Sequence, residues 1–248
     1  MKGTTCPDLS ASVSYCSLLS VARAYNNPLK PAMLSNLGRA ERIPLRPSPS
    51  VCLGRVCLLA SWDYDAGDWQ NLATDIERPR YLALAEILNS GAVQTVLDIG
   101  AGEAHLKRFL RDNIFYVGVE PSLTACRLAS LKANAMMVHS TAEKIFLGKA
   151  NWDAIVFNES IYYCADPRTL IEKAQRSLKP SGKIVLSIYQ KKPTWREQVA
   201  ARMTNARATE IVRSYLSEHA IYTERFVENR WLLFIGEFKP EIASATHA

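Results

Sequence analysis

From about residue 80 onward, short apolar runs alternate along the chain with segments whose apolar residues recur at helical spacing. Apolar runs of about four to eight residues fit buried strands, and the longer periodic segments fit helices packed on one face. The predicted strands are residues 94–99, 115–119, 135–138, 153–157, 183–188, 221–227 and 231–238.

The segments between these strands carry helix signals. Helices are predicted at residues 80–90, 105–111, 123–133 and 166–178, and one more within 195–216. Leu84 and Leu88 lie on one face of the first helix, and Gly91 follows as a stop signal. Asp166 is suited to the N-cap of the fourth helix and Pro167 to its first position. This alternation is typical of an α/β fold, in which helices cover both faces of a parallel sheet.

Residues 1–60 lack this organisation. They are rich in serine and proline, and residues 46–50 are typical of a loop. Seven basic and only two acidic residues occur up to Trp62, which leaves +1 of the chain's net charge of +6 for residues 63–248. We interpret residues 1–60 as a disordered extension or as a stretch upstream of the true start, with an organelle-targeting segment as the alternative. The domain is then predicted at 61–240, with a flexible tail at 241–248.

Composition excludes several classes of partner. Because residues 63–248 are nearly neutral, a nucleic-acid interface is not expected. No apolar run is long enough to cross a bilayer, so no membrane contact is expected either. The six cysteines form no CxxC pair and the four histidines are scattered, which predicts reduced thiols, a cytoplasmic location and no metal site.

The sharpest motif is a glycine turn that follows the strand at 94–99. The sequence from Val96 to Ala104, VLDIGAGEA, places Gly100 and Gly102 where the backbone must turn tightly and leave room for a ligand. Twenty-two residues after Asp98, the next strand ends at Glu120. An acidic residue at this place is suited to accept hydrogen bonds from the ribose hydroxyls of an adenosine.

A nicotinamide-binding fold is the main rival for such a turn. Against it, the third glycine of the dinucleotide fingerprint is missing, and Ala104 follows Gly102 after a single residue. Asp98 would face a pyrophosphate unfavourably, whereas it can hold the glycine loop and face a cationic ligand. The last two predicted strands are separated only by residues 228–230, so they must be antiparallel neighbours.

Over residues 63–240 the chain resembles the class I S-adenosylmethionine-dependent methyltransferases. The resemblance rests on the turn at 98–102, on Glu120, on the Thr-Ala-Glu step at 141–143, on the strand ending at Asn158 and on the turn at 178–182. It implies a doubly wound, mostly parallel seven-stranded sheet of order 3-2-1-4-5-7-6, with the last strand antiparallel.

The resemblance also implies S-adenosylmethionine as the cofactor. Gly100 and Gly102 would make room for its methionine part, Glu120 would bind the ribose, and Ala142 would offer its N–H to the adenine. Many relatives have Asp where this chain has Thr141, whose hydroxyl can also accept a hydrogen bond. The full set of implied cofactor-binding residues is Asp98, Gly100, Ala101, Gly102, Glu120, Pro121, Thr141, Ala142 and Asn158.

Acceptor chemistry is expected after the fourth strand, at Glu159 and Tyr162. The sequence Glu-x-x-Tyr-Tyr from 159 to 163 resembles that of nodulation-factor N-methyltransferases and related natural-product enzymes. Glu159 could orient or deprotonate the acceptor, and Tyr162 or Tyr163 could line its pocket or pack in the core. Tyr64 or Trp69 could cover the cofactor or serve as packing anchors.

The predicted function is transfer of a methyl group to nitrogen or oxygen of a small molecule, such as an amino sugar, an amine or a natural product. The alternatives are a non-catalytic partner subunit that binds the cofactor and a nicotinamide-dependent oxidoreductase. The sequence leaves the acceptor and the oligomeric state open.

Overall fold

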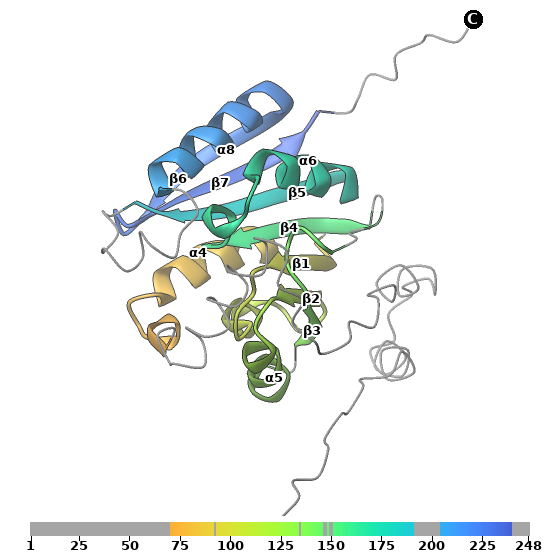
Figure 1. The fold of residues 1–248 in the computed structure, drawn as a ribbon, viewed down its shortest axis with the longest axis vertical. Coiled ribbons are helices and arrows are strands. Elements are labelled where there is room, and N and C mark those ends of the chain that lie inside the picture. The colour runs from red at the N-terminus through yellow and green to blue at the C-terminus, as the bar shows by residue number, and fades with distance from the viewer. Residues whose placement is uncertain are drawn as a thin grey trace, which may run out of the picture. The chain divides into compact units, whose positions relative to one another are not determined.

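The computed structural model describes residues 70–91, 93–133, 135–145, 148, 151–190 and 204–239. The predicted extension at 1–60 and the tail at 241–248 lie outside the described residues, as do Tyr64 and Trp69. Figure 1 shows the fold.

Seven strands form a single sheet of order β3-β2-β1-β4-β5-β7-β6, which confirms the predicted topology. Strands β1 to β5 are parallel where they pair, whereas β7 is antiparallel to both β5 and β6. The strands are β1 Thr95–Ile99, β2 Phe115–Glu120, β3 Met136–His139, β4 Trp152–Asn158, β5 Leu178–Tyr189, β6 Ala220–Val227 and β7 Trp231–Phe238.

Helices cover both faces of this sheet, with α4 and α5 on one side and α6 and α8 on the other (Figure 1). Asp166 caps α6 by accepting the Thr169 N–H at 3.1 Å, as the sequence predicts. The α-helices are α4 Arg78–Asn89, α5 Leu123–Lys132, α6 Pro167–Ser177 and α8 Asn205–His219. The short 3₁₀ helices are η1 Gln70–Ala73, η2 His105–Phe109 and η3 Ile161–Tyr163.

The segment predicted as a helix at 105–111 is shorter and is a 3₁₀ helix. Asn89 at the end of α4 donates its side-chain amide to the Phe109 carbonyl at 2.9 Å and accepts the Arg111 N–H at 2.9 Å. These two bonds occupy backbone groups that a longer helix would use, and Leu110 turns extended and buries its side chain. Periodicity alone cannot reveal a cap that comes from another helix.

The turn predicted at 178–182 is an irregularity inside β5. Trp152 pairs with Leu178, whereas Ala154 pairs with Lys183, so β5 holds extra residues at this point. A Cβ atom on Gly182 would lie 2.8 Å from the Trp152 carbonyl oxygen. Glycine is therefore needed here because the two backbones approach closely.

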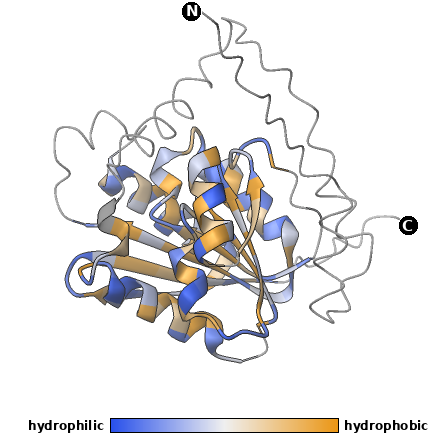
Figure 2. Ribbon diagram, turned by 90° about the horizontal axis from the view of Figure 1, so that it is seen from below, coloured by the Kyte–Doolittle hydropathy of each residue, from blue (hydrophilic) through white to orange (hydrophobic). Residues whose placement is uncertain are grey.

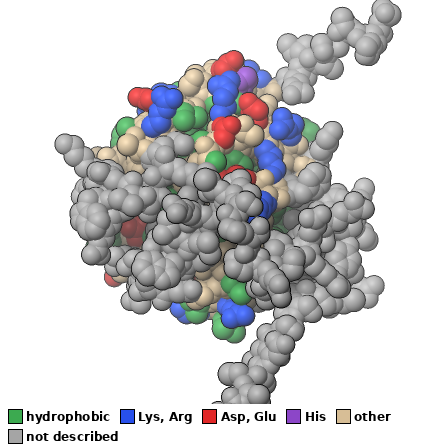
Figure 3. All heavy atoms as spheres, viewed as in Figure 1, with side chains coloured by type: hydrophobic (Ala, Val, Ile, Leu, Met, Phe, Trp, Pro, Cys, Tyr) green, Lys and Arg blue, Asp and Glu red, His purple; other side chains and the backbone are tan. Residues whose placement is uncertain are grey.

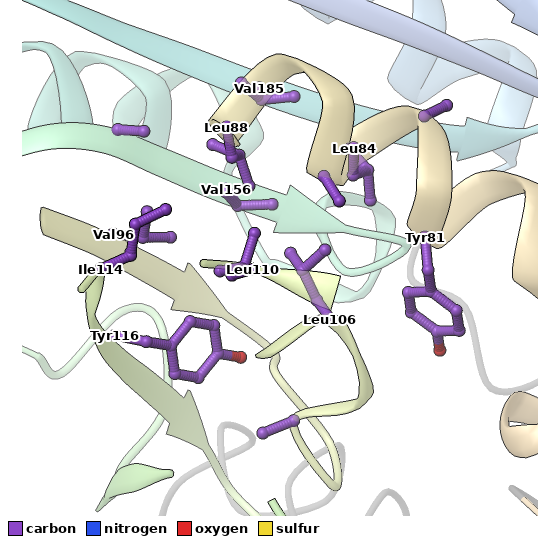
Figure 4. Packing of buried hydrophobic residues seen from close by; sticks show 14 of the residues in the cluster. Tyr81, Leu84, Leu88, Val96, Leu106, Leu110, Ile114, Tyr116, Val156 and Val185 are labelled. Carbon is purple, nitrogen blue, oxygen red and sulfur yellow. The ribbon is translucent and has the colours of Figure 1, made fainter. Parts of the chain in front are cut away.

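The core lies on both faces of the sheet, whose strands are largely hydrophobic (Figure 2). Every residue of β1 and of β2 is buried, as expected for parallel strands covered twice. Beneath α4, Leu84 and Leu88 pack close to Val156 (Figure 4). This packing places the N-terminal part of α4 near the carboxyl ends of the central strands.

On the face shown in Figure 3, Lys and Arg side chains are interspersed with Asp and Glu over the part that the structure describes. No helix among the described residues has the length and apolar character of a membrane span. Among the same residues, no group of three or more His, Cys, Asp or Glu side chains could hold a metal ion.

Candidate active site

The carboxyl ends of β1, β2 and β4 meet at one edge of the sheet. Ile99 pairs with Val119, and Asp98 pairs with Val156, so the glycine turn after β1 lies between the ends of the other two strands. In open α/β sheets ligands bind at this edge.

The glycine turn is held by backbone hydrogen bonds to β2 and packs against the segment that follows β4. The N–H groups of Gly100 and Ala101 donate to the Val119 carbonyl at 2.8 and 3.1 Å. Gly100 and Gly102 have φ values of 78° and 56°, which favour glycine. A Cβ atom on Gly100 would overlap the Cβ of Ser160, so the space beside Gly100 is filled by the segment after β4. Packing against Ser160 is thus a reason for Gly100 in addition to the predicted room for a ligand.

Glu120 fastens the same turn through its carboxylate. One oxygen accepts the Gly102 N–H at 3.0 Å, and the other accepts the Ser122 N–H at 2.8 Å. The side chain is buried, and burial raises the pKa of Glu120 to about 7 although both hydrogen bonds act in the opposite direction. Next to it, the Pro121 carbonyl oxygen lies 2.9 Å from the Nε2 of His139.

Thr141 and Ala142 follow β3 at the same edge. The Ser140 N–H donates to the Glu120 carbonyl at 3.1 Å, which joins the ends of β2 and β3. The Thr141 carbonyl accepts hydrogen bonds from the N–H groups of Lys144 and Ile145, three and four residues later. Both Thr141 and Ala142 are half-buried. The two predicted adenine-side residues are therefore close to the predicted ribose-side residue.

Asp98 is fully buried at the end of β1. One carboxylate oxygen accepts the Tyr116 hydroxyl at 2.7 Å, and within the described part of the chain the other oxygen has no hydrogen-bond partner. Burial raises the pKa of Asp98 to about 7, opposed by Tyr116 and by the positive charge of Arg80. The bond that holds this carboxylate comes from β2, whereas the sequence suggested a bond to the glycine loop.

The end of β4 carries the predicted acceptor-side residues. Asn158 accepts the Ser187 hydroxyl at 3.0 Å, and the Glu159 N–H donates to the Ser187 carbonyl at 3.2 Å. Glu159 has a φ of 60°, which is unusual for a residue other than glycine and costs of order 1 kcal/mol or more. Such strain occurs where the surrounding structure directs a side chain to a particular place.

Tyr162 holds the Glu159 carboxylate. Its hydroxyl donates to Glu159 Oε2 at 2.9 Å, and both side chains are largely buried. Burial raises the pKa of Glu159 to about 7, opposed by Arg80 and by this hydrogen bond. The predicted pair is thus brought together, with Tyr162 as the partner of Glu159, and the ring of Tyr163 lies against that of Tyr162 at 4.7 Å.

Arg80 is a site residue that the sequence analysis did not identify as functional. It is 1% exposed and pairs with Glu77 at 2.9 Å and with Glu159 Oε1 at 3.8 Å. Its guanidinium also lies over the rings of Tyr81 and Trp231, at 4.9 and 5.6 Å. The sequence could have indicated Arg80 by its position, because it shares the buried face of α4 with Leu84. A charged side chain on such a face needs partners of opposite charge or hydrogen-bond acceptors.

Three buried side-chain atoms without a hydrogen-bond partner are found among the described residues, and all belong to this cluster. They are Arg80 Nε, Asp98 Oδ1 and Glu159 Oε1, from α4, β1 and the end of β4. A buried polar atom without a hydrogen bond costs about 1–3 kcal/mol, so three such atoms in one place mark a candidate site for a polar ligand. We call Arg80, Asp98 and Glu159 the charged cluster.

Comparison with known proteins identifies the family. Residues 69–224, more than half of the chain, match the family described as Methyltransferase domain. The chain therefore belongs to this methyltransferase family, and the resemblance to class I S-adenosylmethionine-dependent methyltransferases is confirmed. None of the curated proteins matches the chain.

Solved structures share the fold at low sequence identity. The 1,6-didemethyltoxoflavin-N1-methyltransferase of Burkholderia thailandensis is 17% identical, with a TM-score of 0.58 over 79% of this chain and 94% of that chain. The N-methyltransferase NodS of Bradyrhizobium japonicum is 20% identical, with a TM-score of 0.55 over 70% of this chain and 92% of that chain. A putative methyltransferase of Haloferax volcanii, solved with the Trm112 activator, is 19% identical, with a TM-score of 0.58 over 72% of this chain and 96% of that chain.

Proposed function

We propose that this protein transfers a methyl group from S-adenosylmethionine to a nitrogen or oxygen atom of a small-molecule acceptor. The observation that carries the proposal is the charged cluster, in which three buried atoms on α4, β1 and the end of β4 lack a hydrogen bond, within a methyltransferase fold. A buried charged cluster with unsatisfied hydrogen-bonding atoms supports a catalytic protein over a non-catalytic partner subunit.

The residues at the ends of β1 and β2 fit this cofactor. Asp98 keeps a buried carboxylate oxygen free for a positively charged or hydrogen-donating group. The Glu120 oxygens each accept one backbone bond and retain further lone pairs, which ribose hydroxyls can use. S-adenosylmethionine, when bound, supplies an activated methyl group on a positively charged sulfur atom.

On the acceptor side, Glu159 is the residue that would position the acceptor or remove its proton. Methyl transfer is an in-line displacement, so holding the acceptor at roughly 3–3.5 Å from the methyl carbon in a site without water provides much of the catalysis. A carboxylate with a pKa of about 7 can accept a proton from an ammonium or hydroxyl near neutral pH. Tyr162 and Arg80 would hold that carboxylate in place, since both contact it.

A small acceptor is supported by the structural neighbours. One was solved with 1,6-didemethyltoxoflavin and S-adenosylhomocysteine, and a plantazolicin methyltransferase with a triazolic desmethyl analogue. The near-neutral charge of residues 63–248 agrees with an acceptor other than nucleic acid. We further expect the protein to act in the cytoplasm, in keeping with the thiol form of the buried Cys126 and Cys164.

Two measurements test the proposal. Calorimetric titration should show saturable binding of S-adenosylhomocysteine and no binding of NAD. Incubation with labelled S-adenosylmethionine and a pooled metabolite extract should then yield a labelled small product. Saturable NAD binding without any response to S-adenosylhomocysteine would refute the proposal.

A further inference from the structure

A cavity of about 270 Å³ lies between η1, the first turn of α4 and η2. Its lining includes Arg78, Tyr81, His105, Arg108 and Phe109. A single water molecule occupies about 30 Å³ of liquid, so the cavity can hold a small organic group. None of these five residues belongs to the charged cluster or to the predicted cofactor-binding set.

One wall of the cavity is aromatic. The rings of Tyr81 and Phe109 are stacked, with centroids 5.7 Å apart and an angle of 9°, and the His105 ring lies 6.1 Å from that of Tyr81. In Figure 4 the Tyr81 ring lies to one side of the aliphatic side chains that fill the space beneath α4. A flat aromatic wall favours a planar ligand, because rings gain contact area by stacking.

Two arginines, Arg78 and Arg108, also line the cavity. Within the described part of the chain, neither Arg78 nor Arg108 forms an ion pair, and Arg78 lies 5.9 Å from the centroid of the Phe109 ring. Asp75 is the one carboxylate in the lining, so the cavity has two cations and one anion. Unpaired guanidinium groups bind carboxylates and phosphates strongly through paired hydrogen bonds.

The cavity shares a wall with the charged cluster. Tyr81 lines the cavity with its side chain, and its hydroxyl accepts a hydrogen bond from Arg80 at 3.2 Å. Arg80 in turn pairs with Glu159, which the proposed function assigns to the acceptor. Tyr81 and Arg80 therefore connect the cavity to Glu159.

We propose that this cavity binds an anionic part, a carboxylate, of an aromatic methyl acceptor, with Arg78 and Arg108 holding the anion and Tyr81 and Phe109 holding the ring. The proposal rests on the proposed function and narrows its substrate class to aromatic acids that carry an amine or hydroxyl. The carboxylate of the cofactor's methionine part is the other source of the same chemistry, and the test separates the two.

Benzoate is a suitable probe, with benzyl alcohol as its uncharged counterpart. Each is titrated into the full chain by calorimetry or NMR, with and without saturating S-adenosylhomocysteine. We expect benzoate to bind about tenfold or more tightly than benzyl alcohol, and to bind together with S-adenosylhomocysteine. Arg78→Gln and Arg108→Gln should each weaken benzoate about tenfold, whereas Arg127→Gln, the same change on the exposed surface of α5, should leave it unchanged.

Three results would overturn the proposal. Equal binding of benzoate and benzyl alcohol would show that the cavity does not select an anion. Equal benzoate affinity in the Arg78, Arg108 and Arg127 variants would place the probe elsewhere. Competition between benzoate and S-adenosylhomocysteine, with S-adenosylhomocysteine weakened by Arg108→Gln, would assign the cavity to the cofactor. Failure of the proposed function is recognised separately, because the wild-type protein would then not bind S-adenosylhomocysteine at all.

Discussion

Glu120 and Glu159 are both buried glutamates at the carboxyl edge of the sheet, yet their surroundings differ. The oxygens of Glu120 each accept a backbone N–H, one from the glycine turn and one from Ser122. In Glu159, one carboxylate oxygen accepts a hydrogen bond from Tyr162, whereas the other is buried without a hydrogen bond and forms an ion pair with Arg80 at 3.8 Å. The backbone of Glu159 has a φ of 60°. The hydrogen bonds of Glu120 stabilise the glycine turn, whereas Glu159 keeps a carboxylate oxygen without a hydrogen bond on a strained backbone.

This difference suggests separate roles for the two ends of the carboxyl edge, with cofactor binding near Glu120 and catalysis near Glu159. Both oxygens of Glu120 are already held by backbone N–H groups, so we expect a ligand to bind there without rearrangement of the backbone. The charged cluster contains the buried atoms that lack a hydrogen bond and the strained backbone of Glu159. Natural proteins retain such features at functional sites. We therefore expect changes near Glu159 to affect turnover and stability strongly, and changes near Glu120 to affect mainly cofactor affinity.

The largest effect is expected from Glu159→Gln. If Glu159 orients or deprotonates the acceptor, turnover should fall about 10²–10⁴-fold while S-adenosylhomocysteine affinity changes little. Steady-state kinetics across pH would measure it, and wild-type activity should rise with pH through about 7 as Glu159 ionises. Glu143→Gln is a matched control, because that carboxylate accepts the Ala165 N–H at the same edge. Unchanged kinetics in Glu159→Gln would leave the residue only a structural role.

Arg80→Ala should destabilise the protein most. Removing one partner of a buried ion pair costs about 3–5 kcal/mol, because Glu77 and Glu159 lose their compensating charge. Since Glu159 can take up a proton, the loss should be smaller at pH 5 than at pH 8. Denaturant unfolding measures both, with Arg168→Ala, an exposed ion-pair residue, expected to cost less than about 1 kcal/mol. An Arg80→Ala variant as stable as Arg168→Ala would contradict the buried network.

Asp98→Asn should change how stability depends on pH. The pKa of Asp98 is raised to about 7 in the folded protein, so the folded state binds this proton more tightly than the unfolded state. Its contribution is therefore present below pH 4 and is lost as pH rises towards 7. In Asp98→Asn this decline of about 2–4 kcal/mol should disappear from the unfolding free energy of the cofactor-free protein.

Asp153→Asn provides a control of opposite sign for that experiment. Asp153 is hydrogen-bonded by Lys179 and Thr95, which hold its pKa below the ordinary value despite partial burial. Its stabilising contribution is lost as pH falls, so the variant should lose stability mainly above pH 4. The same pH profile in both variants would show that Asp98 is not protonated in the folded state.

Glu120→Ala should weaken binding of S-adenosylhomocysteine by about 1–3 kcal/mol, since it removes charge-assisted hydrogen bonds. Calorimetry gives this value, and unfolding experiments report the separate cost of freeing the Gly102 and Ser122 N–H groups. Glu224→Ala, which breaks an exposed pair with Arg213, should leave the affinity unchanged. An unaltered affinity in Glu120→Ala would exclude its predicted contact with the ribose.

The smallest effect is expected from removing residues 1–60. Because these residues lack core-forming periodicity, a chain that begins at Ser61 should melt cooperatively at about the same temperature as the full chain and bind S-adenosylhomocysteine equally well. Calorimetric melting of the two chains compares them directly. A marked fall in melting temperature would mean that the removed segment stabilises the domain.

The pattern of the chain determined the strands and helices and the α/β class, because strands buried on both faces are apolar throughout and helices between them keep a separate period. The order of the strands came from the resemblance to class I methyltransferases. The pattern also located the glycine turn, Glu120 and Glu159, since each follows a predicted strand directly. The prediction of a helix over residues 105–111 was wrong, because Asn89 from another helix binds the backbone of Phe109 and Arg111 and ends the segment early.

Only the tertiary structure decided how the charged residues combine. The partners of Arg80 are Glu77, one turn away in sequence, and Glu159, 79 residues later, which α4 approaches because its apolar face packs on the sheet. Likewise, the contact between Gly100 and Ser160 exists because β1 and β4 are neighbours. Local periodicity reports which residues are buried, whereas the pairing of buried charges depends on contacts between distant segments, and those are set when the elements pack.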